Sequence, residues 1–526
     1  MSGRTGDGQS GARQLQRYVA AVVPASTSGS PQKLRTTDAR VAIVLAGGAS
    51  AVAIVRCRCG VPSGPASPGR RHFTGTDRLR HHLRGSPLPE IRPFRALRYA
   101  PDVVADLALV VAPPYDVIGP AEQRRLLDRH PKNVVRLDLP TLEPGDEPDD
   151  RYRRAARTLA AWRSDGTLHK EARPSIYVYE QTYRVPGSGV ERTQRGFFGR
   201  LKLEAFGPGS GVLPHERTLE APREDRYRLL RATGVNTSPV VGLYDEASGT
   251  SATILASIAS RPAGIDVTDD DGVEHRLWHV AADGDLADDV ADLLRLAAGG
   301  PVTIADGHHR YETALRYRDE RRMSRSCEED PAFDYLLMLF LEATAEPLTV
   351  LPTHRVVHGL GPAGLAGLRE GLPTLFREEP ADRAGLEAAF GGAGSAGGEG
   401  RFGLWTRDGG WILTARRAAF ASAEPTGGRA LRELDVTLLG SALERLVGLD
   451  AAAIAGGERV TYTKSVSEAI DAVNGDLDGA DAAFLLEPTP VAAITAVARD
   501  GDVMPQKSTY FYPKALTGLV INPLEW

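Results

Sequence analysis

Residues 301–318, PVTIADGHHRYETALRYR, constrain the fold more than any other segment of the chain. Residues 301–305 form a short apolar run typical of a buried strand, the Asp306-Gly307 pair is a tight-turn signal, and residues 311–318 have a helix-forming composition. The segment therefore predicts a strand that runs directly into a helix, with polar side chains gathered at the junction.

This junction is a predicted phosphate site, because the first turn of a helix exposes free backbone N–H groups and a partial positive charge. Arg310 adds a cation, and a histidine adds acid–base chemistry near neutral pH. We therefore predict that the backbone amides of this helix end and Arg310 hold phosphate, that His308 or His309 provides acid–base chemistry, and that Asp306 and His308 are candidate catalytic residues. Neighbouring helical residues point about 100° apart, so the two histidines do not both serve one centre. The alternative is a helix capped by Asp306 with solvated histidines.

Predicted helices and strands alternate from residue 91 onward, which indicates an α/β (α+β) fold. The expected helices are residues 121–129, 149–164, 223–233 and 286–297. The expected strands are residues 133–139, 175–183, 196–203, 240–244, 402–406 and 411–414, and residues 334–341 are a buried strand or helix. We expect a basic disordered extension (1–90), a core with the candidate site (91–355), and a C-terminal α/β region (356–526).

Charge and cysteine content narrow the classes of partner. Residues 1–90 carry 13 Lys and Arg against four Asp and Glu, so residues 91–526 have a net charge of −14. An acidic folded part argues against nonspecific nucleic-acid binding, although the basic extension is either an arm for nucleic acid or unstructured. Three cysteines form no disulfide framework, which favours the cytoplasm, and Cys57-x-Cys59 lacks a second pair for a metal. The apolar run 41–55 is shorter than the roughly 20 residues of a membrane span, so no membrane segment is expected.

The segment Leu213-Pro-His-Glu-Arg-Thr218 is a second candidate site, because functional loops lie on rigid scaffolds. His215 is a candidate acid–base group, Glu216 a candidate general base or divalent-ion ligand, and Arg217 a candidate phosphate clamp. Asp225 and Arg226, in the following helix, are candidate substrate contacts. A surface loop with internal ion pairs is the alternative.

Three further segments offer pocket residues. In VAPPYDV (111–117) two prolines would hold Tyr115 and Asp116 rigidly, to line a pocket or as a stiff connection. In PQKSTYFYPK (505–514) Lys507 is a candidate phosphate or carboxylate contact, since the chain has seven lysines against 56 arginines; surface decoration is the alternative. His354 and Arg355 complete the same pocket or mark an isolated strand end.

Seven motifs occur together and in order: PFRALRY, VAPPYDVI, NVVRLDLP, LPHERT, ADGHHRYETAL, LPTHR and MPQKSTYFYPK. This set resembles the bacterial and archaeal domain-of-unknown-function-1015 family, often labelled SpoOJ/ParB-like, over residues 91–526. The Asp-Gly-His-His-Arg motif is similar to the phosphate-gripping motif of the ParB/sulfiredoxin superfamily. This similarity implies phosphate contacts from Gly307, His308, His309 and Arg310. The resemblance implies a ParB/sulfiredoxin-like mixed α/β core. One departure is Gly440, where the family pattern leads us to expect a histidine.

The resemblance implies nucleotide di- or triphosphate binding and, among its branches, a small-molecule kinase. We predict a nucleotide-dependent phosphotransferase for a small hydroxy metabolite such as free serine, with ADP or ATP and with Mg²⁺ held through Asp306 or Glu216. The alternatives are a phosphomonoester hydrolase acting on a phosphoserine-type compound and a ParB-like nucleotide-binding or DNA-partition regulator. The expected partners are the nucleotide and the small-molecule substrate, and the sequence does not specify an oligomeric state.

Overall fold

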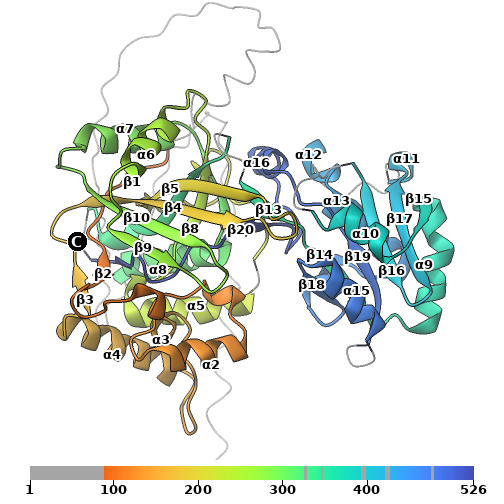
Figure 1. The fold of residues 1–526 in the computed structure, drawn as a ribbon, viewed down its shortest axis with the longest axis horizontal. Coiled ribbons are helices and arrows are strands. Elements are labelled where there is room, and N and C mark those ends of the chain that lie inside the picture. The colour runs from red at the N-terminus through yellow and green to blue at the C-terminus, as the bar shows by residue number, and fades with distance from the viewer. Residues whose placement is uncertain are drawn as a thin grey trace, which may run out of the picture. The chain divides into compact units, whose positions relative to one another are not determined.

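The computed structural model describes residues 88–218, 220–324, 329–344, 348–392, 399–420, 427–475 and 479–525, all of them within one compact unit, Phe73–Trp526. The expected extension up to residue 87, the apolar run 41–55, and Cys57, Cys59 and Cys327 lie outside the described residues. The described part confirms the α/β fold class, with helices and strands alternating around a large mixed sheet (Figure 1).

A nine-stranded mixed sheet forms the framework of the candidate site. Its strand order is β6-β11-β8-β12-β5-β4-β10-β9, and β1 pairs with β5. The strands are β1 (Ile91–Arg92), β4 (Ser175–Arg184), β5 (Glu191–Lys202), β6 (Val212–Leu213), β8 (Val240–Tyr244), β9 (Ile265–Thr268), β10 (Glu274–Ala281), β11 (Val302–Asp306) and β12 (Tyr335–Glu342). The hairpin β4–β5 is antiparallel, whereas β11 is parallel to β6 and antiparallel to β8.

The two faces of this sheet follow from the alternation of side chains along a strand. Ile176, Val178 and Phe197 belong to a core shared with the helices, whereas Tyr177 and Phe198 belong to a core shared with the C-terminal segment. The helices packed in the first core are α5 (Glu220–Thr233), α6 (Thr250–Ala259), α7 (Ala287–Ala297) and α8 (His308–Ser324), and α5 lies beside α8 (Figure 1).

The N-terminal helices differ from the sequence prediction at one place. The helices are η1 (Leu107–Leu109), η2 (Tyr115–Val117), α2 (Pro120–Arg129), α3 (Val135–Asp138) and α4 (Asp150–Ser164), and β2 (Leu97–Tyr99) pairs with β3 (Leu168–Lys170). The prediction of a strand at 133–139 was wrong, because α3 occupies its centre. Asn133 accepts the N–H of Val135 and donates to the carbonyl of Leu109, which starts a helical turn, and Val134 and Val135 are fully buried. Tertiary packing therefore overrides the β preference of two valines.

A second sheet of six strands, ordered β15-β17-β16-β19-β14-β18, occupies the later part of the chain. Its strands are β14 (His354–His358), β15 (Phe376–Ala381), β16 (Arg401–Thr406), β17 (Gly409–Ala415), β18 (Val460–Thr463) and β19 (Ala480–Leu485). The helices of this part are α9 (Gly361–Leu375), α10 (Arg383–Phe390), α11 (Arg417–Phe420), α12 (Arg429–Arg432), α13 (Asp435–Val447), α14 (Ala451–Ala455), α15 (Val466–Asn474) and α16 (Val491–Arg499).

The C-terminal segment returns to the first sheet. Strand β20 (Tyr510–Tyr512) pairs with β13 (Thr349–Leu351), and β21 (Asn522–Pro523) pairs with β7 (Val235–Asn236). The buried guanidinium of Arg200 donates to the side chain of Asn522 at 2.6 Å and fixes this return. The C-terminal segment is therefore ordered, and it lies beside elements that precede it by more than 150 residues.

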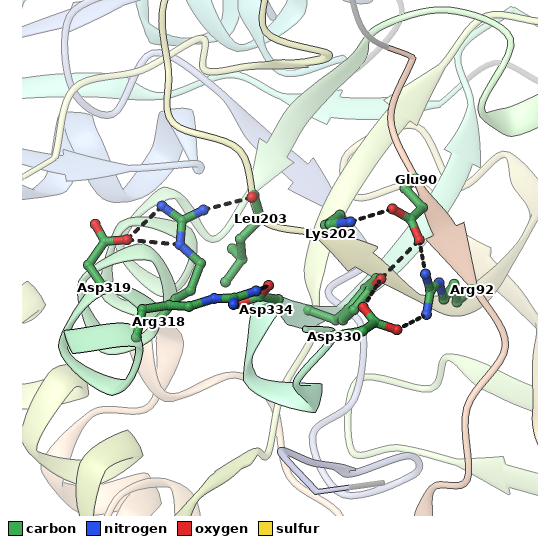
Figure 2. A network of polar contacts seen from close by, with 10 residues as sticks. Glu90, Arg92, Lys202, Leu203, Arg318, Asp319, Asp330 and Asp334 are labelled. Atoms are coloured by element: carbon green, nitrogen blue, oxygen red, sulfur yellow. Dashed lines mark hydrogen bonds and ion pairs between the residues drawn. The ribbon is translucent and has the colours of Figure 1, made fainter. Parts of the chain in front are cut away.

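A polar network at the C-terminal end of α8 connects this helix to neighbouring elements, among them the turn η3 (Ala332–Asp334), which precedes β12. Arg318 donates to the carbonyl of Leu203 and to Asp319, and Arg322 forms a bidentate pair with Asp334 (Figure 2). These contacts fix the direction of α8 and, with it, the position of its first turn. Of the helices in the described part of the chain, none has both the length and the apolar character needed to cross a bilayer.

Candidate active site

The predicted strand-to-helix junction is formed by β11, a single glycine and α8. Asp306 ends β11, Gly307 has a φ of +89°, and the N–H of Tyr311 donates to the Gly307 carbonyl to start the helix. A β-carbon on residue 307 would lie 2.9 Å from Nε of Arg310. Glycine is therefore required both for the left-handed backbone and for the close approach of the Arg310 side chain.

Asp306 lies between two cations. Its Oδ1 accepts from Nζ of Lys514 at 2.6 Å, its Oδ2 pairs with Arg310, and Arg310 also donates to the carbonyl of Pro239. Burial would raise the pKa of Asp306, but the charges of Lys514 and Arg310 outweigh it and hold that pKa far below its ordinary value. The Asp306–Lys514 pair joins the Asp-Gly turn to a lysine more than 200 residues later in the chain, so the C-terminal segment reaches the junction.

His215 and His308 form a buried contact next to this pair. Nδ1 of His215 donates to the carbonyl of Ile304, its Nε2 accepts from the hydroxyl of Thr509 at 2.9 Å, and its backbone N–H donates to Nε2 of His308 at 3.2 Å. The ring centroids of the two histidines are 4.6 Å apart. Burial lowers the pKa of His215 to about 4 and lowers that of His308 strongly, so both rings are neutral at pH 7.

Glu216 lies beside the histidine pair and contacts the C-terminal segment. Its Oε1 accepts the backbone N–H of Lys507 at 2.9 Å, and Lys507 adopts a φ of +55°, which is uncommon for a residue with a β-carbon. Burial raises the pKa of Glu216 to about 7, although Lys507 acts in the opposite direction. The loop therefore holds a half-buried carboxyl group that exchanges a proton near neutral pH, and the strained backbone of Lys507 is part of its support.

Three of the seven lysines of the chain, Lys464, Lys507 and Lys514, lie close to one another here, and the sequence analysis gave a candidate role only to Lys507. The Tyr510 ring lies between two ammonium groups, with Nζ of Lys464 at 4.1 Å and Nζ of Lys514 at 4.4 Å from its centroid. Burial, Lys514 and Lys507 lower the pKa of Lys464. Lys464 follows β18, far from the other motifs in the sequence. The scarcity of lysine in an arginine-rich chain was the signal that could have found it.

A cavity of about 280 Å³ opens beside this stack. Four stretches line it: the residues around Pro113, helix α2, the loop 269–271 and the segment that carries Tyr510 and Lys514. On its acidic side, burial and the neighbouring aspartates raise the pKa of Asp271. The cavity therefore brings part of the VAPPYDV motif and part of the C-terminal motif to one place, together with four cationic side chains, those of Arg125, Arg129, Lys464 and Lys514.

Other predicted residues form a separate polar group. Arg226 is buried, stacks over the Tyr115 ring at 4.0 Å and pairs with Asp225, while Asp225 also accepts from Arg151 and Tyr152. Arg226 and Arg310 line a cavity of about 50 Å³. Burial and then Asp116 raise the pKa of Tyr115. Tyr115, Asp225 and Arg226 therefore lie near Arg310, and their polar groups contact mainly one another.

The remaining predicted residues have different surroundings. His309 is in the first turn of α8, where burial lowers its pKa and the charge of the exposed Asp116 opposes that change. Arg217 is exposed. His354 is buried and its Nδ1 accepts the N–H of Leu486 at 3.2 Å, and burial lowers its pKa to about 4.

Arg355 follows His354 in β14 and is also buried. Since successive strand residues point to opposite faces, it does not share the surroundings of His354. The ring of Tyr462 lies 5.8 Å from its guanidinium. Burial lowers the pKa of Arg355, while Tyr462 and Glu216 act in the opposite direction, so its guanidinium lies within electrostatic reach of Glu216.

Asp306 and Glu216 are the two carboxylates predicted as Mg²⁺ ligands. In the part of the chain that the structure describes, no three His, Cys, Asp or Glu residues are grouped as a metal site. Both oxygens of Asp306 already accept from cations. Mg²⁺ is commonly held by one or two carboxylates together with substrate phosphates. The residues therefore fit Mg²⁺ only as an ion that arrives with a nucleotide.

The solved structures to which this chain is similar include the following three. A free serine kinase in complex with AMP is 12% identical with a TM-score of 0.30, covering 57% of this chain and 83% of its own. A conserved hypothetical protein from Pyrococcus furiosus is 14% identical with a TM-score of 0.29, covering 57% of this chain and 87% of its own. SbnI with a C-terminal truncation, from Staphylococcus aureus, is 12% identical with a TM-score of 0.31, covering 60% of this chain and 84% of its own.

Among curated proteins no significant sequence match is found. The sequence profile of one family matches residues 91–437, which is more than half of the chain and includes the β11–α8 junction, Glu216 and β14. The match confirms the resemblance to the DUF1015 family over the stretch that holds the first six of the seven motifs, and the seventh, MPQKSTYFYPK, lies beyond it. The chain belongs to the family described as "Protein of unknown function (DUF1015)".

Proposed function

We propose that this protein is a nucleotide-dependent phosphotransferase that transfers a phosphoryl group to the hydroxyl of a small metabolite such as free serine. The observation that carries the proposal is Glu216, a carboxyl group with a pKa of about 7, held against Lys507 and beside the Asp306–Lys514 pair. A carboxylate of this kind accepts a proton efficiently near neutral pH. Lysines next to it supply the positive charge that phosphoryl transfer requires.

In this proposal Glu216 is the general base. Its Oε1 is held by the Lys507 N–H, so the other oxygen, Oε2, receives the proton of the acceptor hydroxyl. The first turn of α8, with Gly307, His308, His309 and Arg310, is the proposed phosphate grip, to which Lys507 and the exposed Arg217 add charge. Asp306 keeps Lys514 and Arg310 in place and lowers the net charge of the cluster.

His215 and His308 have a positioning role in this mechanism. The hydrogen bonds of His215 fix its tautomer, and the bond from its backbone N–H to His308 links the Glu216 loop to the first turn of α8. Because both rings are neutral at pH 7, they orient Glu216 rather than supply a proton. Tyr115, Asp116, Asp225, Arg226, His354 and Arg355 are the proposed substrate-side residues.

The nucleotide is proposed to be ADP or ATP with Mg²⁺. When bound, Mg²⁺ would neutralise phosphate charge. We also propose that residues 91–355 form a ParB/sulfiredoxin-like core and that residues 356–526 form a C-terminal region. The cavity beside Lys514 provides room for one of the small molecules.

The proposal is tested with the full chain, ADP or ATP, and free serine, with phosphoserine as the product measured. Glu216→Gln keeps the shape of the side chain but not its basicity, and we expect it to lower kcat by roughly 10²–10⁴-fold. Since the pKa of Glu216 is about 7, the wild-type rate should fall as the pH drops through 7, when the base becomes protonated.

The matched control is Glu224→Gln, an exposed glutamate of α5 that pairs with Arg228 and Arg316. It should leave the rate and its pH profile unchanged. Phosphate released from phosphoserine without nucleotide would instead support the hydrolase alternative. Absence of both reactions together with DNA binding at physiological salt would contradict the enzyme proposal.

A further inference from the structure

The surroundings of Arg355 are incomplete without a ligand. The residue is 3% exposed, and its guanidinium donates to the carbonyl of Thr353 at 3.2 Å. Among the described residues, no Asp or Glu forms an ion pair with it within 4 Å. A buried cation that lacks an anionic partner is costly, because its lost hydration is not replaced.

A second polar group beside Arg355 is also unsatisfied. The hydroxyl of Thr353 is buried and, among the residues that the structure describes, makes no hydrogen bond. Buried hydroxyl groups normally have a partner. A guanidinium and a hydroxyl that are both short of acceptors are the donors that a carboxylate or phosphate group requires.

Strand pairing brings the segment before Arg355 next to the loop that holds Glu216. Thr353 follows β13, whose Leu351 pairs with Tyr510 of β20, and the backbone N–H of Lys507, just before β20, donates to Glu216. Arg355 and Tyr462 belong to the paired strands β14 and β18, and both interact electrostatically with Glu216. The phosphate grip is at the first turn of α8, next to Arg310 and Lys514, and Arg355 comes from the other sheet. A group bound to Arg355 therefore belongs to the molecule whose hydroxyl faces Glu216.

We propose that the acceptor carries a compact oxyanion, a carboxylate or a phosphate, and that Arg355 and Thr353 bind this group while its hydroxyl faces Glu216. The inference rests on the proposed function, because it takes Glu216 as the group that faces the acceptor. It makes Arg355 the residue that selects an anionic over a neutral hydroxy compound. It also gives the second sheet a direct role in substrate choice.

The test uses three compounds with the same three-carbon skeleton: glycerate, glycerol 3-phosphate and glycerol. Binding to the full chain is measured by calorimetry without nucleotide, so that the result does not depend on turnover. We expect the wild type to bind at least one of the two anions and to bind glycerol at least about tenfold more weakly, the effect of one charge-assisted contact. The preferred anion distinguishes a carboxylate from a phosphate.

Arg355→Gln should remove this preference, and Arg355→Lys should restore part of it. The matched control is Arg377→Gln, an exposed arginine of β15 in the same sheet that pairs with Glu379, which should keep the wild-type preference. Thermal unfolding of each variant shows whether it folds, and Thr353→Val provides a second variant that leaves the guanidinium in place and should weaken anion binding.

The outcomes separate the two proposals. Equal binding of glycerol and both anions by the wild type, or an anion preference that survives in Arg355→Gln, would overturn the inference about Arg355. A preference that depends on Arg355 in a protein that transfers no phosphoryl group would support the anion subsite and contradict the phosphotransferase function. If transfer occurs but the KM for glycerate does not rise in Arg355→Gln, only the acceptor inference fails.

Discussion

Similar charged residues surround the two ends of helix α8, but they are buried to different degrees. At its first turn, Asp306 pairs with Arg310 and Lys514, all of them nearly buried, beside a carboxyl group with a raised pKa. At its other end, Arg318 pairs with an aspartate that is 63% exposed, and nearby Lys202 pairs with Glu90 at the surface (Figure 2). Arginine, lysine and carboxylate side chains therefore lie at both ends of the helix, and these ion pairs differ in how deeply their side chains are buried.

The difference teaches how to distinguish a candidate site from a structural network. The network in Figure 2 satisfies its own charges: Glu90 accepts from Lys202 and Arg92, and Arg92 also donates to Asp330 at 2.6 Å. Beside Arg355, in contrast, the described residues leave the Thr353 hydroxyl without a partner. Buried polar groups that lack a partner within the chain indicate a binding site, whereas charged groups that pair with one another indicate a structural role.

The largest expected contrast between the two ends comes from removing one lysine at each. Lys514→Met leaves the buried Asp306 with one cation, and we expect a loss of about 3 kcal/mol in the free energy of unfolding, at the lower end for a broken buried pair because Arg310 remains. Lys202→Met breaks a pair whose side chains are 39% and 36% exposed, and should cost less than about 1 kcal/mol. Equilibrium urea unfolding measures both, and equal losses would refute the distinction by burial.

Glu216 and Glu90 are expected to affect stability in opposite directions, because the pKa of Glu216 is raised in the folded state and that of Glu90 is lowered. The pKa of Glu216 is raised in the folded state, so its ionisation destabilises the fold as the pH rises from about 4.5 through 7. Glu216→Gln should therefore stabilise the protein at pH 8, by roughly 2 kcal/mol after a discount for partial exposure, and change little at pH 5.

For Glu90, burial raises the pKa but hydrogen bonds from Lys202, Tyr335 and Arg92 outweigh it, so the net pKa is lowered. Its ionised form adds stability above about pH 4.5, which is lost as the pH falls through the lowered pKa. Glu90→Gln should therefore destabilise the protein at both pH 6 and pH 8. The thermal unfolding midpoints of both variants across this pH range test the signs of the two stability changes. A Glu216→Gln variant that is destabilised at pH 8 would contradict the raised pKa of the half-buried Glu216.

Much of this contrast was predictable from the sequence, because it depends on local patterns. The apolar run before Asp306, the Asp-Gly turn and the helix that follows predicted β11 and α8, and Glu216 was singled out from its own motif. The family resemblance was also readable in order along the chain. Local chemistry and spacing were sufficient for these features.

The remaining features depend on contacts between distant residues. Lys464 reaches the site only because β18 pairs with β14, and Lys514 reaches Asp306 only because the C-terminal segment packs against the first sheet. Likewise, 133–139 reads as a strand until the contact between Asn133 and Leu109 is known. No periodicity within one segment carries such information, so side chains that meet across 200 residues were found only in the structure.

The smallest expected contrast concerns two glycines with left-handed backbones. Gly307 has a φ of +89° and little space, since a β-carbon would lie 2.9 Å from Nε of Arg310, whereas Gly234, at the end of α5, has a φ of +65° and no atom within 4 Å of that position. Gly234→Ala should cost about 1 kcal/mol, from the backbone alone. Gly307→Ala should cost roughly 1 kcal/mol more, because Arg310 must also move away from Asp306. If urea unfolding shows equal losses for both variants, the first turn tolerates a displaced Arg310, and the tight packing that distinguishes this end of α8 from the other is not needed for its stability.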